Sequence, residues 1–114
     1  MSGTTYQPGD VLLIPFPYSD RLASKKRPVL LLTVADEMGD INCLPITSST
    51  HHPDGFPLRP EHFSDGQLPK ESWVRTGKVY TLNTALVVGK FGTLHKHIFQ
   101  QVQQVLCSRL GCDA

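Results

Sequence analysis

Hydrophobic residues gather in short runs along the first half of the chain, with turns and loops between them. Apolar runs cover residues 10–14, 29–34 and 41–46. Runs of this length without clean alternation are typical of strands that are covered on both faces, or that twist strongly in a small barrel. Gly39 and Asp40 mark a tight turn before the third run, so the pattern predicts hairpin strands in this part of the chain.

The second half of the chain shows weaker strand patterns. A brief edge strand with prolines is expected at 56–59, and further strands are expected at 72–75, 78–82 and 85–91. The rest of the segment 48–71 is rich in Ser, Pro, His, Gly and Asp, which is typical of a loop. The pattern therefore predicts a chain built of short strands up to about residue 91.

The period of the pattern changes near the C-terminus. Apolar residues recur there at three- and four-residue spacing: Leu94, Ile98, Val102, Val105, Leu106 and Leu110. This spacing predicts one apolar stripe of an α-helix, with Thr93 as its N-cap and Gly111 just past its end. We therefore expect a single domain over residues 1–114, mainly β, in which a small barrel or rolled sheet is plugged by a C-terminal helix.

Composition is that of an ordinary globular domain. Hydrophobic residues make up 39% of the chain and charged residues 18%, with a net charge of +1, which argues against disorder and does not by itself indicate nucleic-acid binding. No apolar run approaches the ~20 residues that cross a bilayer, and the N-terminus does not resemble a signal peptide, so we expect a cytoplasmic protein without membrane contact. Three cysteines without repeated spacing are not a disulfide framework, and Cys43, in an apolar run, is expected to be a buried reduced thiol. No residues have zinc-site spacing, so no metal or cofactor is expected.

A basic stretch is the first of three clusters that could carry chemistry. Lys25, Lys26 and Arg27 stand before Pro28, with no acidic residue between positions 21 and 27. Proline biases Arg27 towards an extended conformation, and a rigidly held guanidinium offers a planar fork to a phosphate. The alternative interpretation is a solvated loop.

The other two clusters carry hydroxyl and aromatic groups. Thr47-Ser48-Ser49-Thr50 follows the third apolar run and fits either a turn, in which hydroxyls bond the local backbone, or an anion site at a strand end. In Ser72-Trp73-Val74-Arg75, the Trp is either a core residue or a platform on which a base stacks beside Arg75. His51 and His52 follow the hydroxyl cluster directly and could serve as an acid or a base.

The order of these motifs resembles the PemK/MazF family of toxins over about residues 7–111. The segments that carry the resemblance, besides the terminal helix, are 9–17, 26–30, 45–49, 72–75, 78–82 and 89–94. The resemblance implies an SH3-like β-barrel, a homodimer, and metal-independent cleavage of single-stranded RNA that an antitoxin protein holds in check. It also implies that Arg27 and Thr47 are the catalytic pair, and we assign RNA contacts to Lys25, Lys26, Ser48, Ser49, Trp73 and Arg75.

The chain departs from the family pattern in two places. Many members have an acidic residue two positions after the Arg that matches Arg75, where this chain has Gly77, and a further Arg where it has Tyr80. Two other functions share the fold: a non-enzymatic toxin of the CcdB type, which poisons DNA gyrase, and an SH3-like binding module without catalysis. A CcdB-type toxin carries key residues, including a Trp, at its C-terminus, and this chain ends Gly111-Cys112-Asp113-Ala114.

Overall fold

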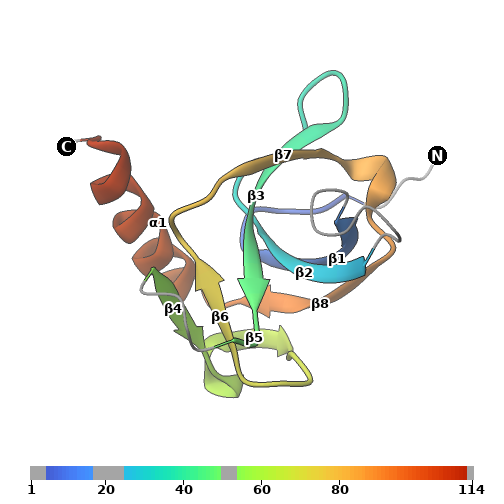
Figure 1. Cartoon of the computed structure of the whole chain (residues 1–114). Helices are drawn as coiled ribbons and strands as arrows, with labels where there is room; N and C mark the ends of the chain where they lie inside the picture. The colour runs from blue at the N-terminus through green and yellow to red at the C-terminus, as the bar shows by residue number, and fades with distance from the viewer. Residues whose placement is uncertain (1–4, 17–24, 50–53, 113–114) are drawn as a thin grey trace.

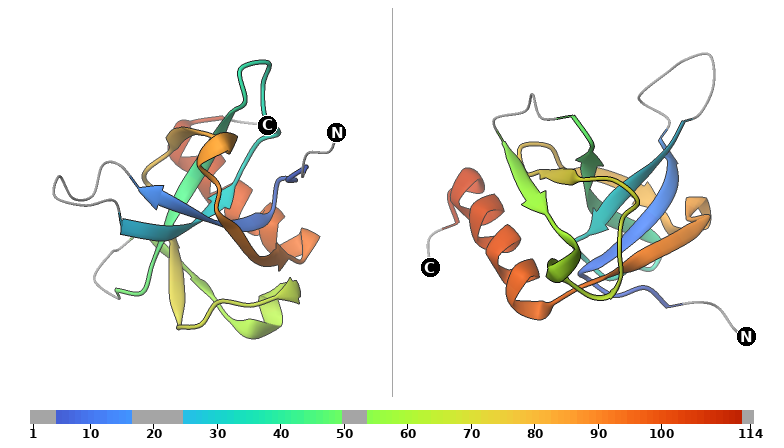
Figure 2. Two further views of the ribbon diagram at one scale, coloured as in Figure 1. Left: turned by 90° about the vertical axis from the view of Figure 1, so that its right-hand side faces the viewer. Right: turned by 90° about the horizontal axis from the view of Figure 1, so that it is seen from below.

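The computed structural model describes residues 5–16, 25–49 and 54–112. Within these ranges, eight antiparallel strands curl into a half-open barrel, and one α-helix packs beside it (Figures 1 and 2). The strands are β1 (Asp10–Phe16), β2 (Lys25–Leu31), β3 (Asp40–Thr47), β4 (Gly55–Leu58), β5 (Phe63–Gly66), β6 (Ser72–Arg75), β7 (Tyr80–Asn83) and β8 (Gly89–Leu94), and the helix is α1 (Lys96–Leu110). The sheet order is β4-β6-β3-β2-β1-β8-β5, with β7 paired to β3. The expected fold class, mainly β with a C-terminal helix, is confirmed.

The central strands are covered on both faces, as their continuous apolar runs predict. On β1, Val11 belongs to one hydrophobic core and Leu12 to another. On β2, Leu30 and Val29 are divided between the same two cores. This division follows from the strand itself, since successive side chains point to opposite faces of the sheet.

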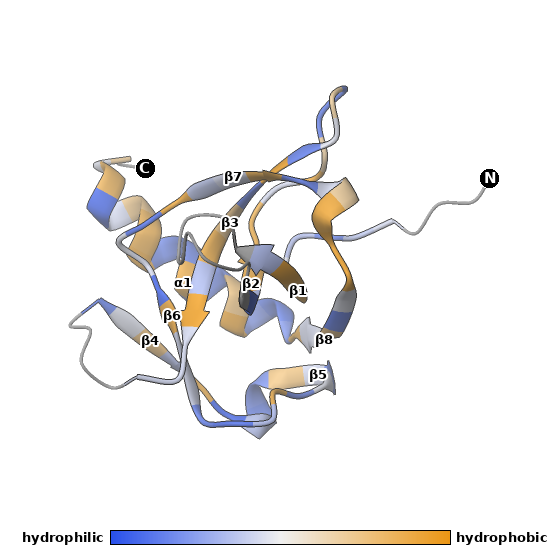
Figure 3. Cartoon of the chain, turned by 45° about the vertical axis from the view of Figure 1, so that its right-hand side comes forward, coloured by the Kyte–Doolittle hydropathy of each residue, from blue (hydrophilic) through white to orange (hydrophobic). Residues whose placement is uncertain are grey.

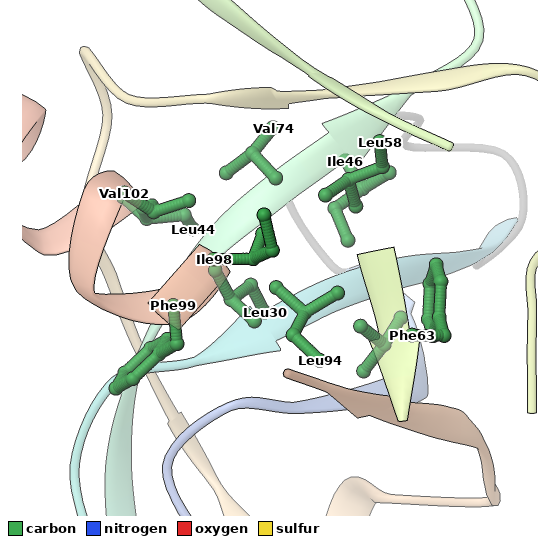
Figure 4. Packing of buried hydrophobic residues seen from close by; sticks show 11 residues of the cluster. Leu30, Leu44, Ile46, Leu58, Phe63, Val74, Leu94, Ile98, Phe99 and Val102 are labelled. Atoms are coloured by element: carbon green, nitrogen blue, oxygen red, sulfur yellow. The ribbon is translucent and has the colours of Figure 1, made fainter. Parts of the chain in front are cut away.

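One of the two cores lies between the sheet and α1. Ile98, Phe99 and Val102 are the buried residues of the helix, and Figure 4 shows Ile98 beside Leu30 of β2. Hydrophobic and hydrophilic residues alternate along α1 in Figure 3, as expected for a helix with one buried stripe. The stripe ends before the helix does, because Leu110 is 68% exposed. In the described part of the chain, no helix is both long and apolar enough to cross a membrane.

The start of α1 differs from the prediction. The helix begins at Lys96. Its N-cap residue is His95, which makes no side-chain capping bond. Thr93 instead belongs to β8, where its hydroxyl donates to Asp10 Oδ1 over 2.8 Å. A tertiary hydrogen bond thus takes the hydroxyl that a local cap would have used. The other end is as predicted, because Gly111 ends the helix in the left-handed region at φ 76°.

The cysteines also differ in part from the prediction. Cys107 and Cys112 form a disulfide, although three cysteines without repeated spacing do not predict a disulfide framework. The left-handed turn at Gly111 folds the chain back, so that the N–H of Cys112 donates to the Cys107 carbonyl and the two side chains meet. Cys43 is buried and reduced as expected, and burial raises its pKa to about 12.

Several strand boundaries depend on pairing rather than on local pattern. β2 begins at Lys25, opposite Phe16 of β1, and ends at Leu31, so Val34 stands in the projecting turn with 61% of its surface exposed. The expected strand at 85–91 is instead a 3₁₀ turn (Thr84–Leu86) followed by β8. The short, polar strand β5 was not expected at all, and its pairing with β8 accounts for it.

Candidate active site

A cavity opens where β2 and β3 separate. The pairing of the two strands is regular up to Val29 opposite Pro45. Pro28 and Pro45 have no N–H to donate, so the hydrogen-bonded ladder weakens at this point. Continuing the register by two residues would set Arg27 opposite Thr47, and both of these residues line a cavity of about 310 Å³.

The remaining walls of the cavity come from distant parts of the chain. Besides Lys26, Arg27, Pro28, Ile46, Thr47 and Ser48, the lining consists of Leu13, Leu68, Pro69, Lys70, Ser72 and Phe91. Buried Ser72 anchors the nearest loop, because its Oγ donates to the Lys70 carbonyl over 2.8 Å. Sequence reasoning missed Lys70, since a single lysine in a polar loop has no pattern that would distinguish it.

Among the described residues, the cavity is lined by cations and by no carboxylate. Its charged residues are Lys26, Arg27 and Lys70. Salt bridges among the described residues engage Arg75 and Lys90, and none of them reaches these three side chains. Arg27 is half-buried, and its Nε has no hydrogen-bond partner among the described residues. A guanidinium held in place without an acidic partner is suited to bind an oxyanion.

The hydroxyl cluster forms a turn that also borders the cavity. Thr47 Oγ1 accepts a hydrogen bond from the Ser49 N–H over 3.0 Å, so the turn interpretation is confirmed for this pair. A hydroxyl that accepts such a bond keeps its own hydrogen for donation to a second group. Ser48 is exposed and lines the cavity, whereas Ser49 is half-buried and does not.

Some residues of the three clusters lie outside the described ranges. Thr50, His51 and His52 belong to residues 50–53, and the side chain of Lys25 is likewise outside the description, although its backbone begins β2. Where the structure does describe the chain, no group of three or more His, Cys, Asp or Glu residues could hold a metal ion.

Neither Trp73 nor Arg75 lines the cavity, although Trp73 is paired with a residue that does. Trp73 of β6 pairs directly with Thr47 of β3, so the two side chains share one face of the sheet. Trp73 is half-buried, which is intermediate between a core residue and an open stacking platform. Arg75 lies two residues farther along β6, and its Nε is 3.5 Å from Asp54 Oδ1. The structure thus brings Lys26, Arg27, Thr47 and Ser48 together and leaves Trp73 and Arg75 beside them.

Asp54 supplies a carboxylate next to the residue where the family pattern has an acid. The Gly77 N–H donates to Asp54 Oδ2 over 2.9 Å, and a Cβ at position 77 would lie 2.6 Å from the same oxygen. Partial burial raises the pKa of Asp54, whereas the Gly77 N–H and the charge of Arg75 lower it, and the pKa falls below its usual value. Sequence reasoning could not pair these residues, which are 23 positions apart.

Comparisons with known proteins agree on one family. The chain matches the model of a family described as PemK-like, MazF-like toxins of type II toxin–antitoxin systems, over residues 7–110. No curated protein sequence gives a significant match.

Solved structures with a similar fold include three bacterial toxins. An endoribonuclease in complex with its cognate antitoxin, from a mycobacterial species, has a TM-score of 0.74 at 16% identity, and the match covers 98% of this chain and 99% of that one. A MazE–MazF complex from Deinococcus radiodurans has a TM-score of 0.75 at 17% identity, over 96% and 100%. MazF alone from the same organism has a TM-score of 0.73 at 19% identity, over 96% and 99%.

Proposed function

We propose, because this chain belongs to the PemK-like, MazF-like toxins of type II toxin–antitoxin systems, that it is an endoribonuclease. The proposed reaction cuts single-stranded RNA without a metal ion. The observation that carries the proposal is the cavity between β2 and β3, where the described lining residues include three cations, the Thr47 hydroxyl and no carboxylate. An anionic backbone fits such a cavity, and RNA also brings its own nucleophile. The solved neighbour described as an endoribonuclease adds support from outside the chain.

Arg27 and Thr47 are the catalytic residues of this proposal. RNA cleavage of this kind needs no nucleophile from the protein, because the 2′-OH attacks the adjacent phosphorus as its proton passes to solvent water. The bond to the 5′ oxygen then breaks and that oxygen takes up a proton, which leaves a 2′,3′-cyclic phosphate and a 5′-hydroxyl. Arg27 stabilises the extra negative charge on the phosphoryl oxygens as the pentacoordinate state forms, and proton donation is its secondary role.

Thr47 holds the phosphate, and the basic residues near Arg27 bind the RNA backbone. The Thr47 hydroxyl, whose oxygen already accepts the Ser49 N–H, donates its hydrogen to a phosphoryl oxygen and fixes its geometry. Lys25 and Lys26 bind flanking phosphates, as does Lys70, which lines the same cavity as Lys26. Ser48 and Ser49, with Trp73 and Arg75 beyond them on β6, extend the contact surface along the RNA.

The partners follow from the same premise. We propose that the protein acts in the cytoplasm as a homodimer, and that a cognate antitoxin covers the Arg27 region until it is removed. Two of the similar structures contain MazE–MazF or a toxin with its antitoxin. An acidic segment that orders on binding would imitate the charge of RNA and block the cavity directly.

The proposal is tested by incubating the purified protein with single-stranded RNA in EDTA. We expect the wild type to cut the RNA, and Arg27→Ala to lose cleavage by about 10²–10³-fold, because one preorganised charge at the phosphate is gone. Arg27→Lys should lose much of the activity as well, because an ammonium cannot form the planar fork.

Lys78→Ala is the matched control, since Lys78 is an exposed cation outside the cavity. It removes the same unit of charge and should leave cleavage near the wild-type rate. All variants should keep the wild-type melting temperature. Full activity in Arg27→Ala would sink the assignment, and cleavage that EDTA abolishes and Mg²⁺ restores would contradict the metal-free mechanism.

A further inference from the structure

A second cavity lies next to the first. It has a volume of about 490 Å³, within the range of pockets that take small ligands. Leu68, Pro69 and Lys70 line both cavities, so one short segment forms their common wall. The described residues of the three clusters singled out in the sequence do not line this second cavity.

The common wall is held in place at both ends. The Gln67 N–H donates to the Phe91 carbonyl of β8 over 3.3 Å, and Ser72 Oγ donates to the Lys70 carbonyl over 2.8 Å. Pro69 restricts the backbone between these two anchors. A ligand that enters either cavity therefore meets a preformed wall, which lowers the cost of ordering it on binding.

The second cavity differs from the first in its charges. In the part of the chain that the structure describes, the first is lined by three cations and no carboxylate. The second has Arg59, Lys70, Glu61 and Glu71 on its wall, two charges of each sign, and also the side-chain amide of Gln67. Two carboxylates repel a phosphate, whereas carboxylates, an amide and a guanidinium together offer both acceptors and donors to a neutral polar ring.

The floor of the second cavity is apolar. Leu58 and Phe63 are 3% and 8% exposed, and they line the cavity together with Leu68 and two prolines. An apolar floor with polar groups at the rim suits a flat heteroaromatic ring, which is buried by its face and bonded at its edge. A nucleobase has an apolar face and a polar edge of this kind, whereas a backbone phosphate does not.

We propose that the second cavity is a subsite for the nucleobase of a nucleotide flanking the scissile phosphate. The phosphate lies in the cationic cavity, and the base crosses the Leu68–Lys70 wall into the neutral one, where its edge meets Glu61 and Gln67. This subsite rests on the proposed RNA cleavage. It adds to that proposal a pocket that would make the enzyme prefer particular RNA sequences. Non-specific phosphate binding and base recognition are then divided between two cavities.

The experiment places single abasic nucleotides in short RNA substrates. The cut site of the wild type is first mapped, and the base is then removed at each of the two nucleotides on either side of the cut. We expect one position at which the loss of the base lowers kcat/KM of the wild type by about 10-fold or more. In the double variant Glu61→Ala, Gln67→Ala, the same missing base should lower kcat/KM by less than about 2-fold, because the groups that bonded it are gone.

Gln103→Ala is the matched control, since Gln103 is exposed on α1 and lies outside both cavities. It should keep the full abasic penalty of the wild type. Both substituted side chains in the double variant are exposed, and Gln67 makes its bond to Phe91 through the backbone, so folding should be unaffected. The subsite is refuted if the wild type cleaves every abasic substrate equally, or if the double variant keeps the penalty. A wild type that cleaves no RNA at all refutes the proposed function, and the subsite with it.

Discussion

Arg27 and Arg75 are both half-buried arginines, but their surroundings differ. The Nε atoms of both lack a hydrogen-bond partner among the described residues, but Arg75 forms an ion pair with Asp54, whereas no ion pair between described residues reaches Arg27. A guanidinium that a carboxylate already neutralises binds phosphate less strongly, because it must share its charge. At the scale of residues, Arg27 is therefore the stronger candidate for the reacting phosphate. Arg75 holds the segment before β4 in place, and its assignment to RNA stays a prediction.

Asp54 should contribute to stability in a pH-dependent way. Its pKa is lowered in the folded protein, so its contribution is present above the unfolded pKa of about 3.9 and is lost as the pH falls through the folded pKa. Asp54→Asn should lower the free energy of unfolding by about 1–3 kcal/mol at pH 7, because it removes a charge-assisted bond to Gly77 and the pair with Arg75. Urea unfolding at pH 7 and at pH 3 measures the difference, which should shrink at the lower pH.

Asp65→Asn is the control for this comparison, because Asp65 is an exposed aspartate on β5. Its free energy of unfolding should stay within about 0.5 kcal/mol of the wild type at pH 7. An Asp54→Asn deficit that is as large at pH 3 as at pH 7 would show that the ionised carboxylate is not what stabilises this segment.

Two places where neighbouring strands meet shape the site. Prolines at positions 28 and 45 coincide with the separation of β2 from β3, which opens the cavity. At the second place, Gly66 of β5 pairs with Gly92 of β8, and a Cβ on either residue would clash with the backbone of the opposite strand. The chain leaves β5 at this close contact and continues into residues 67–70. At the scale of elements, residues without N–H or without Cβ decide where the walls of the cavity lie.

Gly92→Ala should destabilise the protein by about 1–3 kcal/mol or more, because β5 and β8 must move apart to admit the methyl group. Gly89→Ala on the same strand is the matched control, since its Cβ would meet Leu13 at an ordinary 3.9 Å. Thermal unfolding followed by circular dichroism should show a clearly lower melting temperature only for Gly92→Ala. Equal melting temperatures in the two variants would mean that β5 and β8 can accommodate the added methyl group without moving apart.

On the scale of the whole molecule, the sheet is curled but not closed. β4 and β5 end the strand order, and α1 runs beside β4 (Figure 1). Exposed hydrophobic side chains remain on the surface, among them Met38 at 78% and Val88 at 53%. A small domain with open strand edges and exposed apolar groups gains stability when a second copy covers them. These features are compatible with the proposed homodimer, for which family membership is the main argument.

Sedimentation at low micromolar concentration should give twice the mass of one chain. A dilution series in the same buffer is the control, because a specific dimer dissociates with a single constant, whereas aggregation does not. RNA cleavage should be followed at the same concentrations. A monomer that still cuts RNA would remove the dimer from the mechanism and leave the roles of Arg27 and Thr47 intact.

Local signals were sufficient for the central strands, for the C-terminal end of the helix and for part of the site. Continuous apolar runs predicted β1 to β3 because both faces of these strands are buried, and Gly111 predicted the end of α1 because only glycine adopts its φ without strain. Arg27 and Thr47 were both singled out, since each stands at the end of an apolar strand in a recognisable motif. The disulfide was missed, although the turn at Gly111 is itself a local signal.

Only the tertiary structure decided which distant residues meet. Thr93 is a good N-cap by sequence, but Asp10, 83 positions away, takes its hydroxyl and moves the start of the helix. Lys70 joins Arg27 because pairing between β5 and β8 and the bond from Ser72 place its loop along the cavity. A pattern along the chain reports the burial and backbone preference of each residue. It does not report which groups from other strands will share a wall, because that depends on the register and curl of the whole sheet.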